Sequence, residues 1–237
     1  MPPRTSARGR LTEAARVSSI IGGLQQHYPE ARTALEFETT FQLLVAVILS
    51  AQCTDKRVNL VTQELFKNYR TPQDFARLEP DELEGRIKTC GLGPSKARNI
   101  VATSRLLLER HGGVVPGTLA ELIALPGVGR KTANVMLANA FDTAAIAVDT
   151  HVFRVAHRLG LAGGNSPEAT ERDLQRVIPE AQWAPAHHWL IWHGREICHA
   201  RKPECGRCPV LEYCPTGRDL TGMAPLKGLK PWYRPVK

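Results

Sequence analysis

Two glycines and the basic residues that follow them form the segment of this chain best suited to binding an anion. In order, its residues are Gly127, Val128, Gly129, Arg130, Lys131 and Thr132. Both glycines permit a tight turn with positive φ and a close approach of a ligand to the backbone. A helix that starts after the turn presents unpaired N–H groups and the positive end of its dipole, which suit a phosphate oxygen.

Three interpretations of this segment compete. A glycine cap before an ordinary helix explains Gly127 but neither Gly129 nor the basic pair. A phosphate-binding loop of the ATPase type needs a glycine before the lysine and a strand leading in, whereas Arg130 precedes Lys131 and no strand is indicated. A helix-hairpin-helix that grips the DNA backbone without reading its sequence fits best.

Four of the six cysteines are gathered near the C-terminal end. They are Cys198, Cys205, Cys208 and Cys214. Four thiolates can hold a structural zinc ion or an iron–sulfur cluster, and the number of ligands fits both. Without a secretory signal at the N-terminus, we expect a metal site in a cytoplasmic protein and not disulfides.

The segments that must position these residues are helical in pattern. Pro72, Pro80 and Pro167 each stand at an expected helix start, and the apolar run over 41–49 has the length of a buried helix. We predict an all-α protein of about ten helices in two helical domains, with a DNA-binding cleft between them. The expected parts are an N-terminal tail and helix over 1–32, a central six-helix domain with the hairpin over 33–143, a cluster domain over 144–214 and a basic tail over 215–237.

The charge of the chain favours a polyanionic partner. Its 237 residues carry a formal net charge of +8 and the sequence pI is about 9.4. Such an excess attracts polyanions, and nucleic acid is the usual one. No apolar run approaches the roughly 20 residues that span a bilayer, so no membrane partner is expected. The first ten residues are rich in arginine, and we expect a flexible basic tail there, not an organellar targeting signal.

Two further segments carry a family resemblance. Residues 125–135 read LPGVGRKTANV and residues 146–155 read IAVDTHVFRV, and both resemble the endonuclease III family of DNA glycosylases. The resemblance extends from about residue 36 to residue 214. It implies a [4Fe–4S] cluster on Cys198, Cys205, Cys208 and Cys214.

The resemblance also implies catalytic roles. Lys131 is the expected nucleophile, because only a primary amine yields a protonatable imine that can act as an electron sink. Asp149 is the expected essential carboxylate. From the residues alone, Asp149 fits equally well as the N-cap of a helix over 150–159.

The remaining residues that the resemblance implies serve DNA binding. Gln52 and Leu92 are expected to fill the space left by an extruded base, and His151 to lie at the DNA backbone. One departure from the family pattern is Gly93-Pro94, where an aromatic and a polar residue commonly follow the leucine. Ala46 stands where adenine-excising relatives carry a catalytic glutamate, which disfavours excision of adenine.

We therefore predict a monomeric base-excision-repair enzyme acting on double-stranded DNA with damaged bases or abasic sites. It would excise oxidised pyrimidines through a lysine Schiff base and then cleave the strand by elimination. A hydrolytic glycosylase without lyase activity and a non-catalytic DNA-binding protein are the alternatives. A pure binder has no need of a nucleophilic amine.

Overall fold

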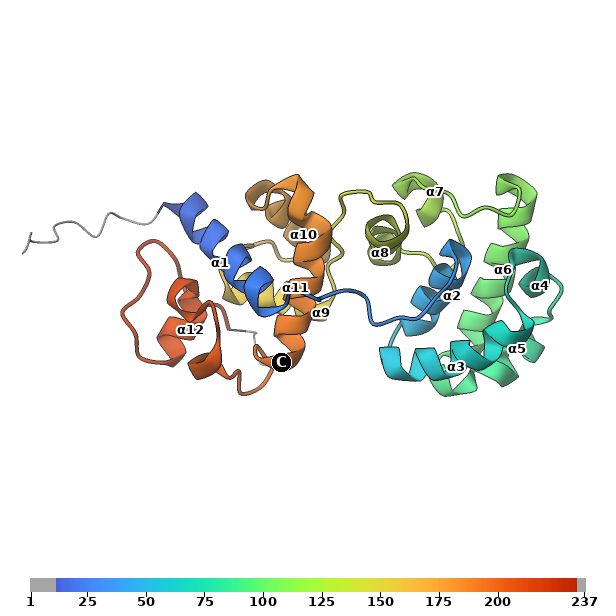
Figure 1. Cartoon of the computed structure of the whole chain (residues 1–237), viewed down its shortest axis with the longest axis horizontal. Helices are drawn as coiled ribbons and strands as arrows, with labels where there is room; N and C mark the ends of the chain where they lie inside the picture. The colour runs from blue at the N-terminus through green and yellow to red at the C-terminus, as the bar shows by residue number, and fades with distance from the viewer. Residues whose placement is uncertain (1–11, 234–237) are drawn as a thin grey trace, which may run out of the picture. The chain divides into compact units, whose positions relative to one another are not determined.

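The computed structural model describes residues 12–233, and these form α-helices and short 3-10 helices without strands (Figure 1). The chain divides into two compact units. We call residues 32–147 the hairpin unit, and the described residues 12–31 and 148–233 the cysteine unit. The boundary falls after Ala147 and not after residue 143.

The hairpin unit contains seven α-helices where six were predicted, and two of the seven have only five residues. Its elements are α2 (Thr40–Ser50), α3 (Asp55–Asn68), α4 (Pro72–Ala76), α5 (Pro80–Ile87), the 3-10 helix η1 (Lys88–Cys90), α6 (Gly93–His111), α7 (Leu119–Ile123) and α8 (Arg130–Ala140).

Helix α2 is the centre of the hairpin unit. The apolar run over 41–49 is buried along its whole length, as its lack of a polar face requires. Thr39 caps the helix by accepting a hydrogen bond from the N–H of Gln42. The prediction of a buried helix here is confirmed.

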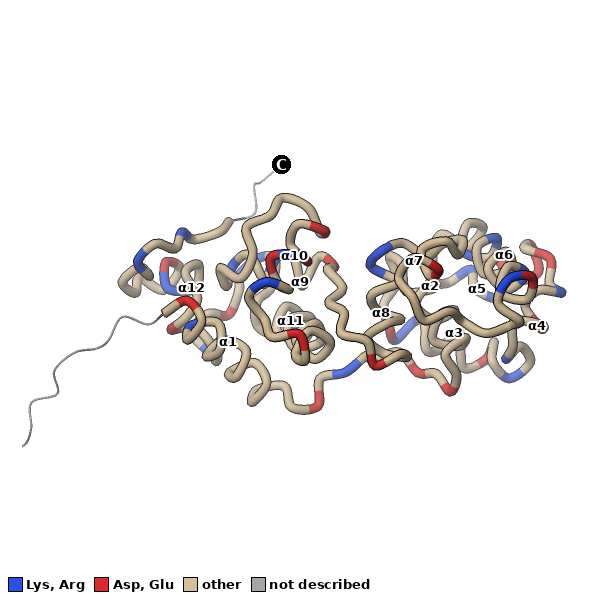
Figure 2. The backbone as a smooth tube through the Cα atoms, turned by 90° about the horizontal axis from the view of Figure 1, so that it is seen from above, with Lys and Arg blue, Asp and Glu red and all other residues tan. Residues whose placement is uncertain are grey.

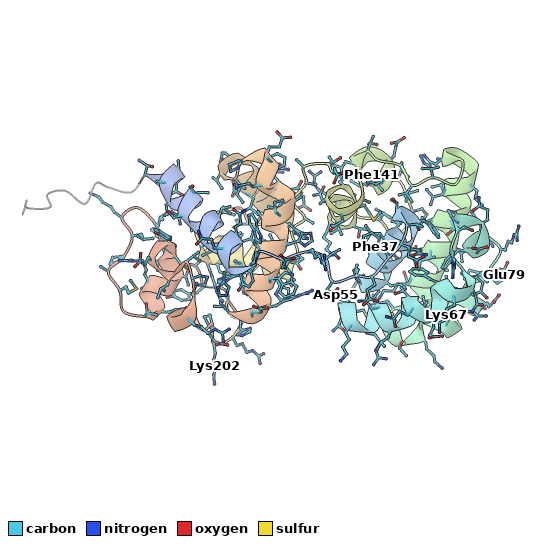
Figure 3. The ribbon with its side chains drawn as sticks, in the orientation of Figure 1. Phe37, Asp55, Lys67, Glu79, Phe141 and Lys202 are labelled. Atoms are coloured by element: carbon cyan, nitrogen blue, oxygen red, sulfur yellow. The ribbon has the colours of Figure 1, made fainter. Side chains whose placement is uncertain are left out.

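Short-range signals set the ends of the other helices in this unit. Thr71 and Asp74 form a reciprocal capping box at the start of α4. Gly112 adopts a left-handed conformation with φ of 59° and ends α6. Phe37 and Phe141, labelled in Figure 3, lie just before α2 and just after α8.

The cysteine unit holds five α-helices and three 3-10 helices. They are α1 (Glu13–His27), α9 (Thr150–Arg158), α10 (Pro167–Val177), η2 (Glu180–Gln182), α11 (Trp183–Glu196), η3 (Cys205–Arg207), η4 (Leu211–Tyr213) and α12 (Pro215–Leu220). Buried Arg16 of α1 connects distant segments, since its guanidinium donates to the carbonyl oxygens of Leu159, Gly160 and Tyr213. Lys and Arg positions occur along the backbone of both units (Figure 2).

Residues 215–233, expected to form a tail, begin with α12 and return to the unit. The N–H of Trp232 donates to Thr216 Oγ1 at 2.8 Å, and its ring lies 5.2 Å from the His157 ring between centroids. The basic segments over 1–11 and 234–237 lie outside the described residues. Among the described helices, none combines the length and the apolar character needed to span a membrane.

Candidate active site and cluster pocket

The hairpin joins α7 to α8, and its two glycines adopt different backbone conformations. Gly127 is left-handed with φ of +75°, and a Cβ at this position would lie 2.7 Å from Asn99 Nδ2. Gly129 instead has extended backbone with φ of −88°, so the expectation of positive φ at both glycines is wrong for Gly129. The reason is that Gly129 is the N-cap of α8, a position that takes extended backbone.

The start of α8 is open to a ligand. Gly129 has no side chain to cap the helix, and a Cβ there would meet no atom within 4 Å. Arg130 and Lys131 are exposed in the first turn, and Thr132 is half-buried. Val128 is only 4% exposed, so only its backbone is available for contact. The first N–H groups of α8, which no side chain caps, and the two exposed cations therefore lie in the same first turn of the helix.

Asp149 is the N-cap of α9, as the sequence indicated. Its Oδ1 accepts hydrogen bonds of 2.8 Å from the backbone N–H groups of His151 and Val152. Within the described chain, Oδ2 accepts no hydrogen bond. The cap thus fixes the carboxylate in space while one oxygen stays available for chemistry.

His151 occupies the first turn of α9, directly after this cap. Its ring is half-buried, and Nδ1 lies 3.2 Å from Arg154 Nη2. Burial lowers the pKa of His151 below its ordinary value of 6.5, although Asp149 acts in the opposite direction. The imidazole is therefore neutral at pH 7, and a phosphate contact from it would be a hydrogen bond, not an ion pair.

Gln52 and Leu92 share an uncommon backbone conformation in the hairpin unit. Both are left-handed, with φ of 53° and 54°, a region that costs about 1–2 kcal/mol for residues other than glycine. Leu92 is 52% exposed and Gln52 is exposed as well. Strained backbone concentrates at functional sites, so two exposed, strained side chains are candidates for contact with a ligand. Pro94 falls in the first turn of α6, where a missing N–H costs nothing.

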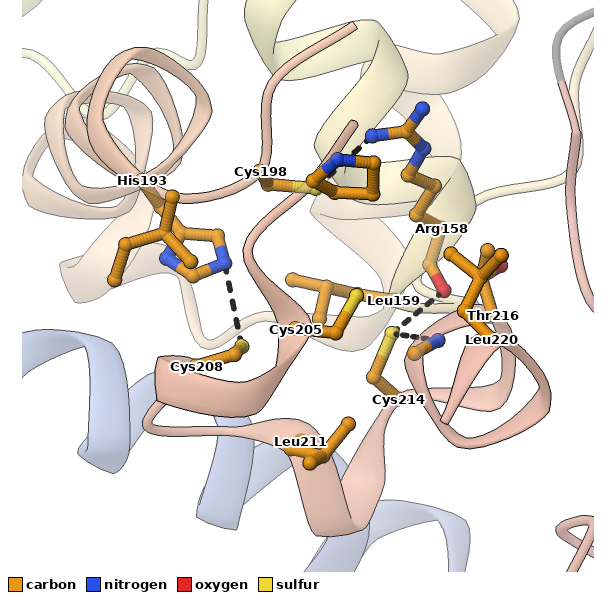
Figure 4. A pocket seen from close by; sticks show the side chains of 13 residues that line it. Arg158, Leu159, His193, Cys198, Cys205, Cys208, Leu211, Cys214, Thr216 and Leu220 are labelled. Carbon is orange, nitrogen blue, oxygen red and sulfur yellow. Dashed lines mark hydrogen bonds between the residues drawn. The ribbon is translucent and has the colours of Figure 1, made fainter. Parts of the chain in front are cut away.

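The four clustered cysteines line one pocket in the cysteine unit (Figure 4). Two side chains reach their sulfur atoms from the pocket wall. Arg158 Nη1 lies 3.5 Å from Cys198 Sγ, and His193 Nε2 lies 3.6 Å from Cys208 Sγ. The backbone N–H of Gly217 donates to Cys214 Sγ at 3.2 Å. Such contacts are typical of the surroundings of a metal-bound thiolate.

Two segments of the chain match known protein families. Residues 45–180 match the family described as HhH-GPD superfamily base excision DNA repair protein, and residues 198–214 match the iron-sulfur binding domain of endonuclease III. Endonuclease III from Rickettsia felis is 50% identical over 202 residues, which cover 85% of this chain and 95% of that protein. The chain belongs to the endonuclease III family.

Solved endonuclease III structures have the same fold. One is described as a trapped endonuclease III–DNA covalent intermediate in an estranged-adenine complex. It is 43% identical with a TM-score of 0.84, covering 89% of this chain and 99% of that one. A non-covalent endonuclease III–DNA complex gives a TM-score of 0.85 at 43% identity, covering 90% of this chain and 99% of that one.

The pocket fits the [4Fe–4S] cluster of the endonuclease III family. The four cysteines line one shared pocket, as the four thiolate ligands of one cluster would. Burial raises the pKa of Cys208 to about 12 and that of Cys214 to about 11. Thiolates in so dry a pocket require the positive charge of bound metal. Arg158 Nε, buried here without a hydrogen-bond partner in the described chain, is a further donor beside it.

Lys96, a buried cation in the hairpin unit, was not predicted from the sequence. Lys96 is 3% exposed and lies on the inner face of α6 beside Ala97 and Ile100. A charged residue at an apolar position of a helix is a signal that could have found it. His193 and Arg158 were missed at the cluster pocket for another reason, since only the folded chain brings them to the cysteines.

Proposed function

We propose that this chain is a base-excision-repair DNA glycosylase with abasic-site lyase activity, and that Lys131 is its nucleophile. The observation that carries the proposal is the exposed amine of Lys131 in the first turn of a helix whose N-terminus has no side-chain cap. Phosphates bound by the hairpin would hold the sugar–phosphate backbone beside this amine. The covalent endonuclease III–DNA intermediate of a relative supports an enzyme-linked mechanism.

The chemistry begins with the neutral amine of Lys131 attacking the sugar carbon that bears the damaged base. The bond from that carbon to the base breaks, and the base leaves with the electron pair and takes up a proton. Loss of the ring oxygen bond then gives a protonated Schiff base, which accepts electrons when a proton leaves the neighbouring carbon. Elimination breaks the bond to the 3′ oxygen, and water later releases the lysine.

Asp149 is proposed to act on charge and protons during these steps. A carboxylate stabilises the positive charge that develops on the sugar as the base departs, and it can relay a proton. The hydrogen bonds to Oδ1 hold the group in place before substrate arrives, which reduces the reorganisation that the reaction requires. This role requires Asp149 and Lys131 to meet at the same sugar.

Gln52 and Leu92 are proposed to fill the gap that an extruded base leaves in the duplex. A base must leave the stack before its sugar can react, and the gap in the duplex costs a few kcal/mol unless it is filled. The exposed side chains of both residues suit insertion, and neutral His151 suits a hydrogen bond to a backbone phosphate. Damaged duplex DNA is the proposed partner, bound by a monomer.

Oxidised pyrimidines are the proposed substrates. Ala46 is fully buried in α2 and offers no carboxylate at the position where adenine-excising relatives have a glutamate. A nucleophilic amine at Lys131 likewise favours the lyase mechanism over a hydrolytic one.

The cysteine loop is proposed to be a structural cross-link with a DNA-facing surface. Cys198, Cys205, Cys208 and Cys214 would hold the cluster, which supplies a rigid centre for a loop with little regular structure of its own. The exposed cations of this loop are Arg201, Lys202 and Arg207, of which Arg207 pairs with Glu204 at 3.0 Å.

Product analysis on a defined lesion tests the proposal. A duplex with one oxidised pyrimidine and a 5′ label should yield a shortened strand that ends in an unsaturated aldehyde, without added amine or heat. A duplex with mismatched adenine serves as the control and should stay intact. Release of the base that leaves an intact abasic strand would support the hydrolytic alternative, and no release at all would support a pure binder.

A further inference from the structure

Lys96 has an environment that differs from that of every surface lysine of the chain. Its side chain is 3% exposed, and its Nζ donates hydrogen bonds to three backbone carbonyl oxygens. The acceptors are those of Leu49 at 2.8 Å, Ala51 at 2.7 Å and Cys90 at 2.7 Å. An ammonium group has three N–H donors, so the group is fully satisfied.

This arrangement excludes the common reasons for a buried lysine. No carboxylate pairs with Lys96 among the described residues, and a buried ammonium without a counter-ion is costly. A nucleophile needs an accessible lone pair, which an amine saturated by three carbonyls does not have. Burial lowers the pKa of Lys96, and the neighbouring Cys53 and Cys90 act in the opposite direction. The reason for a lysine at this buried position must therefore lie in where its three acceptor carbonyls are in the fold.

The acceptors come from the ends of two helices. Leu49 lies in the last turn of α2, Ala51 is the C-cap residue of that helix, and Cys90 is the last residue of η1. Carbonyls at helix ends lack partners within the helix and carry partial negative charge, so one cation satisfies both ends together. Lys96 is thus a bridge between two loops that are about 40 residues apart in sequence.

These two loops carry Gln52 and Leu92, both exposed and left-handed. The Ala51 carbonyl belongs to the peptide group that precedes Gln52, and the Cys90 carbonyl precedes Gly91 and Leu92. Gln52, Gly91 and Leu92 all have positive φ, with values of 53°, 68° and 54°. Strained conformations persist only where the surroundings hold them, and the hydrogen bonds to Lys96 fix the peptide groups next to each loop.

We infer that Lys96 is a positioning residue that holds the Gln52 and Leu92 loops at the spacing needed to enter a duplex together. The inference rests on the proposed function, because it assumes that these two side chains take the place of an extruded base. Lys96 itself touches neither substrate nor reacting atoms. Its loss should harm the opening of the duplex and spare the chemistry at Lys131.

The variant Lys96→Met keeps the length of the side chain and removes all three donors. Two DNA substrates, one double-stranded and one single-stranded, separate its effect on duplex opening from its effect on the chemistry. Single-turnover excision of an oxidised pyrimidine from a duplex should fall on the order of 10- to 100-fold, the cost of misplacing groups by about 1 Å. Strand cleavage at an abasic site in single-stranded DNA, where no partner base is displaced, should stay within about twofold. Lys67→Met is the matched control, since Lys67 is exposed on α3 (Figure 3) and should leave both rates unchanged.

A second readout needs no chemistry. With 2-aminopurine opposite a non-reactive abasic analogue, wild-type protein should raise the fluorescence as the opposite base is unstacked, and Lys96→Met should raise it much less at saturating protein. A wild type that unstacks the base but cleaves nothing would contradict the proposed function and leave this inference standing. Should Lys96→Met not fold, Lys96→Gln, which keeps two N–H donors, should show the same split to a smaller degree.

A double-mutant cycle completes the test. In a Leu92→Ala background, Lys96→Met should cause less than about a threefold further loss of duplex excision, because residues that act as a unit are not additive. Equal losses on both substrates, full additivity with Leu92→Ala, or wild-type rates and fluorescence in Lys96→Met would each overturn the inference.

Discussion

The Oδ1 atom of Asp149 accepts a hydrogen bond of 2.8 Å from the backbone N–H of Val152, so the proposed catalytic carboxylate is also a helix cap. Substitution can separate the capping role of Asp149 from the role of its charge. Asn caps helices about as well as Asp but carries no charge. We expect Asp149→Asn to lose less than about 1 kcal/mol of stability, the helix-dipole contribution, and about 100- to 1000-fold in single-turnover excision.

Asp149→Ala provides the comparison. It removes cap and charge together and should cost about 1–2 kcal/mol in urea unfolding beyond the loss of activity. If Asp149→Asn retained wild-type excision, the carboxylate would be structural only.

The two hairpin glycines should respond differently to alanine. Gly127→Ala places a methyl group 2.7 Å from Asn99 Nδ2 at a φ of +75°, and we expect a loss of about 1–3 kcal/mol in stability. Gly129→Ala fits the available space, so its stability should change by less than about 1 kcal/mol. DNA affinity should fall, because the added methyl group would stand where the hairpin backbone is proposed to meet a phosphate. Thermal unfolding and a fluorescence binding titration measure both effects. Equal stability of the two variants would contradict the different roles of the two glycines.

The number of DNA phosphates that the protein neutralises can be measured from the salt dependence of its DNA affinity. Arg130→Gln should reduce the slope of log Kd against log salt by about 1, as expected when one fewer phosphate is neutralised. His151→Gln should leave the slope unchanged at about pH 7.5, because burial holds the pKa of His151 below 6.5 and the imidazole carries no charge there. A smaller slope for His151→Gln at this pH would mean that bound His151 is protonated.

The cysteine pocket predicts a selective loss of metal. Cys205→Ala should reduce bound iron and acid-labile sulfide and should lower the stability of the cysteine unit, since the metal contributes to its folding. Cys53→Ala is the control, because Cys53 lies in the hairpin unit and should leave the iron content unchanged. Zinc without iron in purified wild-type protein would contradict the cluster.

Much of this architecture follows from local sequence signals. The buried run over 41–49, the capping box at Thr71 and the glycine stop at Gly112 depend on neighbouring residues, and each can be predicted from them. The left-handed backbone at Leu92 cannot, because leucine has no local preference for that region. Lys96 escaped prediction because two of its three acceptors are 45 and 47 residues away in the sequence. Distant partners of this kind are decided by packing and not by periodicity.

In the proposed mechanism the amine of Lys131 becomes covalently bound to the damaged sugar. Wild-type protein incubated with a lesion-containing duplex and sodium borohydride should give a protein–DNA adduct that survives denaturing electrophoresis, with the DNA mapped by mass spectrometry to the peptide containing residue 131. Lys131→Gln should give no adduct, whereas Lys96→Met should still give one with single-stranded abasic DNA. An adduct of undiminished yield in Lys131→Gln, or excision by the wild type without any trappable adduct, would contradict this mechanism.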